Sequence, residues 1–170
     1  MASNIEIRPL LPEDTIALVK VHYRTFKNSI VPFLFNAEPS EESYKFMASE
    51  RTRILEQPHT KAFKAVDTTT GELVGAAYYK VMAEGANQSD LDSGIPVFDS
   101  FVPEQIPEAW RALSLRLGEC YARHVGTKSC IEVWLMIVDP AHQGKGNRED
   151  AVGMGMPGGG SVSKKLNIRL

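Results

Sequence analysis

An almost wholly apolar run from Ile131 to Val138 leads directly into a turn with proline and glycine, and this junction constrains the fold more than any other stretch. The run has the β-branched and aromatic residues of a strand that is covered on both faces. Asp139 and Pro140 end the strand, and the turn Gln143-Gly144-Lys145-Gly146 follows. Because glycines leave main-chain N–H groups accessible and lysine adds a positive charge, the turn is suited to hold phosphate oxygens.

Length and composition indicate one globular domain. The 170 residues are 43% hydrophobic and 24% charged, which is ordinary for a folded protein with a core. A formal net charge of −2 argues against a protein that binds nucleic acid through overall electrostatics. Cys120 and Cys130 are the two cysteines, and we find no secretory leader and no apolar stretch of membrane length. We therefore expect a protein of the cytosol or nucleus that is not inserted in a membrane.

Hydrophobic periodicity predicts strands and helices in a mixed order. The expected elements are a strand at 4–8, helices at 12–26 and 40–55, a strand hairpin at 61–67 and 73–82, a helix at 108–125 and a strand at 131–138. The first helix should bury an apolar stripe made of Ile16, Val19, Tyr23 and Phe26. Residues 28–38 contain Pro32 and should form a loop that packs Phe33, Leu34 and Phe35 inward, and residues 84–107 should be irregular.

The strand and turn resemble the signature of the GNAT superfamily of acetyl-CoA-dependent N-acyltransferases, a strand ending in Val-x-Pro followed by Gln/Arg-x-x-Gly-x-Gly/Ala. Val138-Asp139-Pro140 and Gln143-Gly144-Lys145-Gly146 match it, although Arg148 stands where the signature has a small residue. The order of elements is similar to the first half of a GNAT domain, and the long insertion and Thr127-Lys128 before the strand are most similar to fungal members. The resemblance implies an incomplete GNAT-like α/β (α+β) fold, with flanking helices on a mixed, mostly antiparallel sheet. The domain would span 1–146, with an insertion at about 84–125.

The same resemblance implies that the chain binds acetyl-CoA as a substrate. The main chain of Met136, Ile137 and Val138 would pair with the pantetheine arm. The pyrophosphate would lie against Gln143, Gly144, Lys145, Gly146, Asn147 and Arg148. His142, beside this turn, is expected to be exposed. No metal is expected, because no histidine has a cysteine or carboxylate at ligand spacing.

Glu132 is the only ionisable residue of the apolar strand. Burial would raise its pKa toward the range that suits a general base, and its place six residues before Val138 is similar to that of the catalytic glutamate in the histone acetyltransferase branch. Two alternatives stay open. Glu132 could be a solvent-facing residue near the strand's start, and a chain of water molecules could serve as the base.

Residues 147–170 do not continue the family pattern, in which a long helix faces the pyrophosphate and a later tyrosine acts as general acid. Five glycines and Pro157 lie between Gly153 and Gly160, which predicts a flexible tail. An altered splice or reading frame would explain this change. Without the next strand of the family, the run 131–138 would be an apolar edge, and a second copy of the chain could cover it as a homo-oligomer.

Two functions remain after the sequence alone. The first is acetyl transfer to a primary amine of a small molecule or a protein, impaired by the loss of the C-terminal half of the domain. The second is a non-catalytic remnant that binds coenzyme A or another partner. The acceptor would be selected by residues 28–38 and 84–107, which carry no diagnostic motif.

Overall fold

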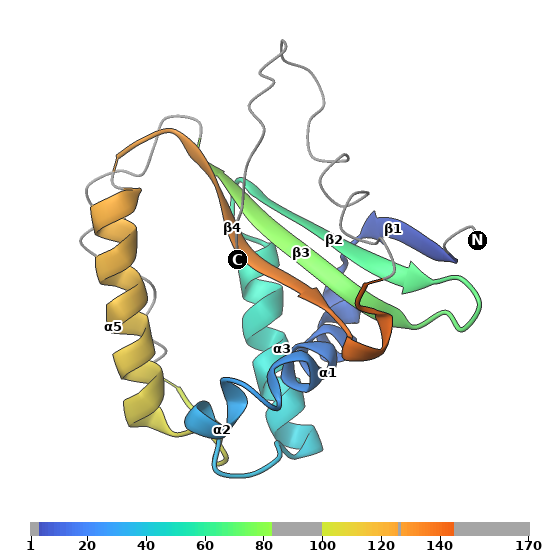
Figure 1. The fold of residues 1–170 in the computed structure, drawn as a ribbon, viewed down its shortest axis with the longest axis horizontal. Helices are drawn as coiled ribbons and strands as arrows, with labels where there is room; N and C mark the ends of the chain where they lie inside the picture. The colour runs from blue at the N-terminus through green and yellow to red at the C-terminus, as the bar shows by residue number, and fades with distance from the viewer. Residues whose placement is uncertain (1–3, 83–99, 126, 145–170) are drawn as a thin grey trace.

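The computed structural model describes residues 4–82, 100–125 and 127–144, which form one sheet with helices beside it (Figure 1). The elements in chain order are β1 (Ile5–Pro9), η1 (Pro12–Asp14), α1 (Thr15–Phe26), α2 (Val31–Leu34), α3 (Glu41–Leu55), β2 (Thr60–Asp67), β3 (Leu73–Met82), α5 (Pro107–His124), β4 (Cys130–Val138) and η2 (Pro140–His142). This arrangement confirms the predicted α/β class. The predicted flexible tail at 147–170 lies outside the described residues, as do residues 84–99 of the predicted insertion.

The four described strands lie in the order β1-β2-β3-β4, and each neighbouring pair is antiparallel. A short turn joins β2 to β3, and Gly71 in that turn has a φ of 76°, which favours glycine. β4 pairs with β3 although a long segment separates them in sequence. Figure 1 shows α5 apart from α1 and α3, beginning near α2 and running toward the start of β4.

Two β-bulges interrupt the regular pairing of the strands. Val74 is the extra residue where β3 pairs with β2, because Ala65 lies opposite Gly75 and Val66 opposite Leu73. Trp134 is the extra residue of β4, since Tyr78 and Tyr79 pair with Leu135 and Val133. A bulge increases the local twist and redirects side chains, so β4 changes direction between its start and its C-terminal end.

α1 packs on two sides, against the sheet and against α3. Leu18 and Val21 join Tyr78 and Ile137 in the core below the sheet. Val19 and Tyr23 pack with α3 in a second cluster. The predicted stripe is therefore right at Val19 and Tyr23 but wrong at Ile16, which is 40% exposed. Because α1 packs on two sides, its buried face also includes Leu18 and Val21 and leaves Ile16 at the surface.

The predicted loop at 28–38 contains the short helix α2. Pro32 is tolerated there because the first N–H groups of a helix have no intrahelical partner. Leu34 is buried, whereas Phe33 is 72% exposed, so the expectation that Phe33 packs inward was wrong. The next helix begins where predicted, because the side chain of Ser40 accepts a hydrogen bond from the N–H of Ser43.

β4 is not covered on both faces within the described segments, which corrects the prediction from its apolar sequence. Ile137 is buried under α1, but Ile131, Val133 and Met136 are 45–51% exposed. The difference arises because the helices that pack on the described sheet, α1 and α3, belong to the core that contains Tyr78 and Ile137. Met136 alternates with Ile137 and points to the other face, and the bulge at Trp134 places Val133 and Ile131 on that face as well.

Candidate functional site

The C-terminal end of β4 directs main-chain groups away from the sheet. The N–H of Asp139 donates to the carbonyl of Val74 at 2.8 Å, so Asp139 faces β3. Main-chain groups of successive residues point to opposite edges of a strand, and those of every second residue point to the same edge. Ile137 therefore also faces β3, and its carbonyl oxygen would lie 2.9 Å from a Cβ added at Gly75. Met136 and Val138 consequently point their N–H and C=O groups to the outer edge of β4.

The outer edge differs between these two residues. The carbonyl of Val138 accepts hydrogen bonds from Nε2 of Gln143 at 3.0 Å and from Oγ1 of Thr25 at 3.3 Å. Gln143 was predicted to contact phosphate, but its side-chain amide instead donates the hydrogen bond that closes the turn. Met136 lies beside a hollow in the sheet that Ile7, Phe63, Ala77 and Val138 also line. Within the described residues the outward N–H and C=O of Met136 have no hydrogen bond comparable to those of the Val138 carbonyl, so the main chain of Met136 is the more available pairing edge.

Asp139 holds the turn that follows β4. Its Oδ1 accepts from the N–H of Ala141 at 3.0 Å, and its Oδ2 accepts from Nε and Nη2 of Arg24 at 3.1 and 2.7 Å. Burial acts to raise the pKa of Asp139, but the hydrogen bonds from Arg24 and Ala141 outweigh it, and the pKa is lowered. These contacts tie the turn to α1, so its position relative to the sheet is determined by tertiary structure.

The far end of the turn is open. Gly144 has a φ of 75°, and no atom lies within 4 Å of a Cβ placed there. His142 is only partly exposed, which corrects the prediction, because its Nδ1 lies 4.0 Å from Oδ2 of Asp67. Lys145, Gly146, Asn147 and Arg148, which were predicted to hold pyrophosphate with Gly144, lie outside the described residues.

Glu132 lies near the beginning of β4 and is partly buried. It pairs in register with Lys80, on the same face as Tyr78. Met136 is four positions further along, which corresponds to about 13 Å along an extended strand. Its negative charge, after burial, helps to raise the pKa of the neighbouring Cys130 thiol. The structure therefore brings Glu132 onto the same strand as Met136 but not into contact with it.

Comparison with solved structures identifies the fold. No protein-family model and no curated protein sequence matches the chain. A mosquito arylalkylamine N-acetyltransferase-like protein, 5b, superimposes with a TM-score of 0.52 and 11% identity over 89% of this chain and 72% of that chain. The fold is that of the GNAT-type N-acetyltransferases. At this identity the match establishes the GNAT-type fold, and the described strands and helices belong to it.

Two other acetyltransferases resemble the chain at lower scores. The aminoglycoside 6′-N-acetyltransferase of Acinetobacter baumannii has a TM-score of 0.46 and 11% identity, covering 88% of this chain and 67% of that chain. A histone acetyltransferase HPA2-related protein of Corynebacterium glutamicum has a TM-score of 0.49 and 16% identity, covering 88% and 68%. In the described segments of the GNAT-type fold, no helix combines the length and apolarity needed to cross a bilayer. Those segments also contain no cluster of three metal-ligating side chains.

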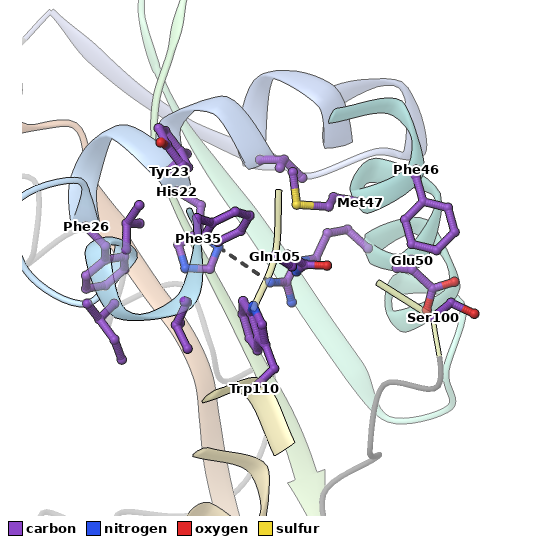
Figure 2. Close-up of a pocket in the computed structure, with 15 residues that line it drawn as sticks. His22, Tyr23, Phe26, Phe35, Phe46, Met47, Glu50, Ser100, Gln105 and Trp110 are labelled. Atoms are coloured by element: carbon purple, nitrogen blue, oxygen red, sulfur yellow. Dashed lines mark hydrogen bonds between the residues drawn. The ribbon is translucent and has the colours of Figure 1, made fainter. Parts of the chain in front are cut away.

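The GNAT-type fold here also encloses a cavity that sequence reasoning missed. It lies among α1, α2, α3 and the start of α5, has a volume of about 80 Å³ and is partly open to solvent. Figure 2 shows Tyr23, Phe26, Phe35, Phe46, Met47 and Trp110 around it. His22 and Arg51 supply polar groups, with Nη2 of Arg51 3.5 Å from Nδ1 of His22 (dashed line in Figure 2). Nothing in the spacing of these residues along the chain predicts this contact.

Proposed function

We propose that this chain is an acetyl-CoA-dependent N-acyltransferase that acetylates a primary amine of a small molecule or a protein. The observation that carries the proposal is the outward main chain of Met136 on β4, close to the bulge at Trp134, in a GNAT-type fold. The pantetheine arm of coenzyme A contains amides, which can hydrogen-bond to a strand edge as an added strand would. In this proposal the main-chain groups of Met136 and the N–H of Val138 hydrogen-bond to the arm. Ile137 holds this part of the strand in place because its side chain is buried in the core.

The turn after β4 is proposed to hold the pyrophosphate. Gly144 is open to solvent and adopts a left-handed conformation, so its neighbours can turn main-chain N–H groups toward an anion. Lys145, Gly146, Asn147 and Arg148 would complete the binding turn by resemblance to the GNAT signature. Asp139 would position this turn from below through Arg24 and Ala141.

The chemistry requires few protein groups, because a thioester is already activated. The neutral amine attacks the thioester carbonyl, a C–N bond forms, and main-chain N–H groups at the strand edge stabilise the developing oxyanion. The C–S bond then breaks and the thiolate leaves, and it takes up the proton that the attacking nitrogen loses as the amide forms. A base must first accept a proton from the ammonium form of the acceptor, and we propose Glu132, directly or through water, for this step.

Binding of acetyl-CoA, measured by isothermal titration calorimetry, tests the proposal. We expect Gly144→Glu to weaken binding about 10-fold or more relative to Gly144→Gln, because the two variants share the same backbone strain and differ in one negative charge near phosphate. Gly71→Glu is the matched control, since Gly71 also has a positive φ in an open turn. Absence of binding to the unaltered chain at millimolar acetyl-CoA would sink the proposal.

A non-catalytic coenzyme A-binding or interaction protein is the second candidate. It is favoured by the hollow beside Met136, where Lys64 is the only ionisable side chain among the lining residues and pairs with Asp14 at 2.6 Å. Release of free thiol from acetyl-CoA separates the two candidates, with polyamines, aminoglycosides, arylalkylamines and peptides as acceptors. Saturable turnover with any of these amines rejects the non-catalytic candidate. Binding of acetyl-CoA without turnover across the panel supports it.

A further inference from the structure

The cavity among α1, α2, α3 and α5 has walls suited to a flat apolar molecule. Tyr23 and Phe35 meet edge to face with ring centroids 5.6 Å apart, and Phe35 meets Trp110 in the same way at 6.0 Å. His22 packs edge to face on Phe26 at 5.2 Å. A wall of mutually perpendicular rings presents both faces and edges, and these are the surfaces against which another aromatic ring packs favourably.

One end of the cavity is polar and carries two side chains, His22 and Arg51, that donate hydrogen bonds. Burial, and then the charge of Arg51, lower the pKa of His22 to about 3, so its imidazole is neutral at physiological pH. The 3.5 Å contact places a guanidinium N–H beside Nδ1 of His22, which must therefore accept. The hydrogen of the neutral ring then belongs on Nε2. Arg51 and His22 together offer N–H donors and no acceptor of their own to a group in the cavity.

The positive charge of Arg51 is not neutralised within the described part of the chain. Two basic residues of α1 do have acidic partners, because Lys20 pairs with Glu41 and Arg24 with Asp139. Glu50, the carboxylate in the cavity wall, pairs with Arg53. Arg51 is partly buried and contacts neutral His22 instead of a carboxylate. An uncompensated cation at a partly buried position costs stability, and a bound anion would remove that cost.

We propose that this cavity binds a small aromatic carboxylate, with its ring among Tyr23, Phe35 and Trp110 and its carboxylate on the guanidinium of Arg51. The planar guanidinium matches a carboxylate with two parallel hydrogen bonds, and Nε2 of His22 is a further donor. The site does not rest on acetyl transfer, because none of the residues that line it belongs to β4 or to the turn after it.

Binding is measured by NMR titration of the unliganded full chain, with no acetyl-CoA present. Three probes share one ring and one chain length: hydrocinnamate, hydrocinnamyl alcohol and the corresponding primary amine. We expect hydrocinnamate to bind about 10-fold or more tightly than either of the others, because charge-assisted hydrogen bonds distinguish them. The amide shifts should map to α1, α2 and α3.

Variants of α3 assign the preference to Arg51. Arg51→Met should abolish the preference for the carboxylate, Arg51→Lys should retain part of it, and Lys45→Met should leave it unchanged. Lys45 is the matched control, since it is an exposed cation on the same helix that does not line the cavity. Without ligand, Arg51→Met should melt at the same temperature as the unaltered chain or higher, which also shows that it folds. A structural role for Arg51 predicts the opposite shift in melting temperature.

Three results would overturn the proposal. They are equal or tighter binding of the alcohol or the amine, an unchanged preference in Arg51→Met, and no binding of hydrocinnamate to the unaltered chain. Loss of acetyl-CoA binding in the separate calorimetric test would leave this proposal intact, because the two experiments share no ligand and the two sites share no residue.

Discussion

Removing the Asp139 carboxylate tests whether one side chain holds the turn after β4. Its side chain is largely buried, and it accepts three hydrogen bonds, two from Arg24 and one from the N–H of Ala141. Asp139→Asn keeps an oxygen for Ala141 but removes the ion pair. Asp139→Ala removes both, so the two substitutions separate the ion pair from the capping hydrogen bond.

The exposure of Arg24 limits how much the ion pair contributes. Its side chain is 56% exposed, so the pair is worth about 0.5–1 kcal/mol and not the larger value of a buried pair. The hydrogen bond to Ala141 adds about 1 kcal/mol, as a side-chain cap does. We therefore expect Asp139→Asn to lower the free energy of unfolding by about 0.5–1 kcal/mol and Asp139→Ala by about 2 kcal/mol.

Urea denaturation of both variants, together with Arg24→Met and the double variant, measures these values. The coupling energy of the double-mutant cycle should match the cost of Asp139→Asn. The lowered pKa of Asp139 adds a pH signature: its contribution is full above the ordinary value of 3.8 and is lost as pH falls through the folded pKa below it. Asp139→Ala within 0.3 kcal/mol of the unaltered chain would refute the assigned role, because this is smaller than any single capping bond.

Two further predictions concern the strand contact below β4 and the cavity. Gly75→Ala should cost about 1–3 kcal/mol in urea denaturation, because the new Cβ meets the carbonyl of Ile137 at 2.9 Å and the strands must separate; unchanged stability would contradict this close approach. His22 has a folded pKa of about 3, below its ordinary 6.5, so the unfolded chain takes up a proton first and stability should fall on acidification through pH 6.5, by up to about 1.4 kcal/mol per unit. The difference in unfolding free energy between the unaltered chain and His22→Gln should show this dependence on pH. A difference that stays constant between pH 7 and 5 would count against a buried neutral imidazole.

Local signals along the chain predicted much of the fold correctly. The apolar run before Pro140 corresponds to β4 within one residue, and the glycine-containing turn at 68–72 joins β2 to β3 as expected. Ser40 caps α3 because its hydroxyl needs only an N–H three residues away. The resemblance to GNAT proteins, which rested on the strand and turn after it, agrees with the GNAT-type fold. These features depend on neighbours within a few residues, so the sequence contains the information directly.

The candidate sites depended on contacts between distant residues. The bulge at Trp134 follows from the pairing of β4 with β3, and the direction of the Met136 main chain follows from that register. The helical spacing of apolar residues did not predict that α1 packs on two sides and that Ile16 is exposed to solvent. Burial of Glu132 was likewise inferred from its apolar neighbours in sequence, whereas the cover of a strand is supplied by helices elsewhere in the chain.

The strand, the turn and their likeness to an acyl-CoA-binding signature were determined by the order of amino acids alone. Only the tertiary structure decided which strand edge is open, what Asp139 holds, and that Arg51 meets His22 among the aromatic rings of a cavity. The physical reason is range. Propensities, caps and turns act over a few residues, whereas hydrogen-bond direction in a sheet, desolvation and the pairing of charges are properties of residues that only folding brings together.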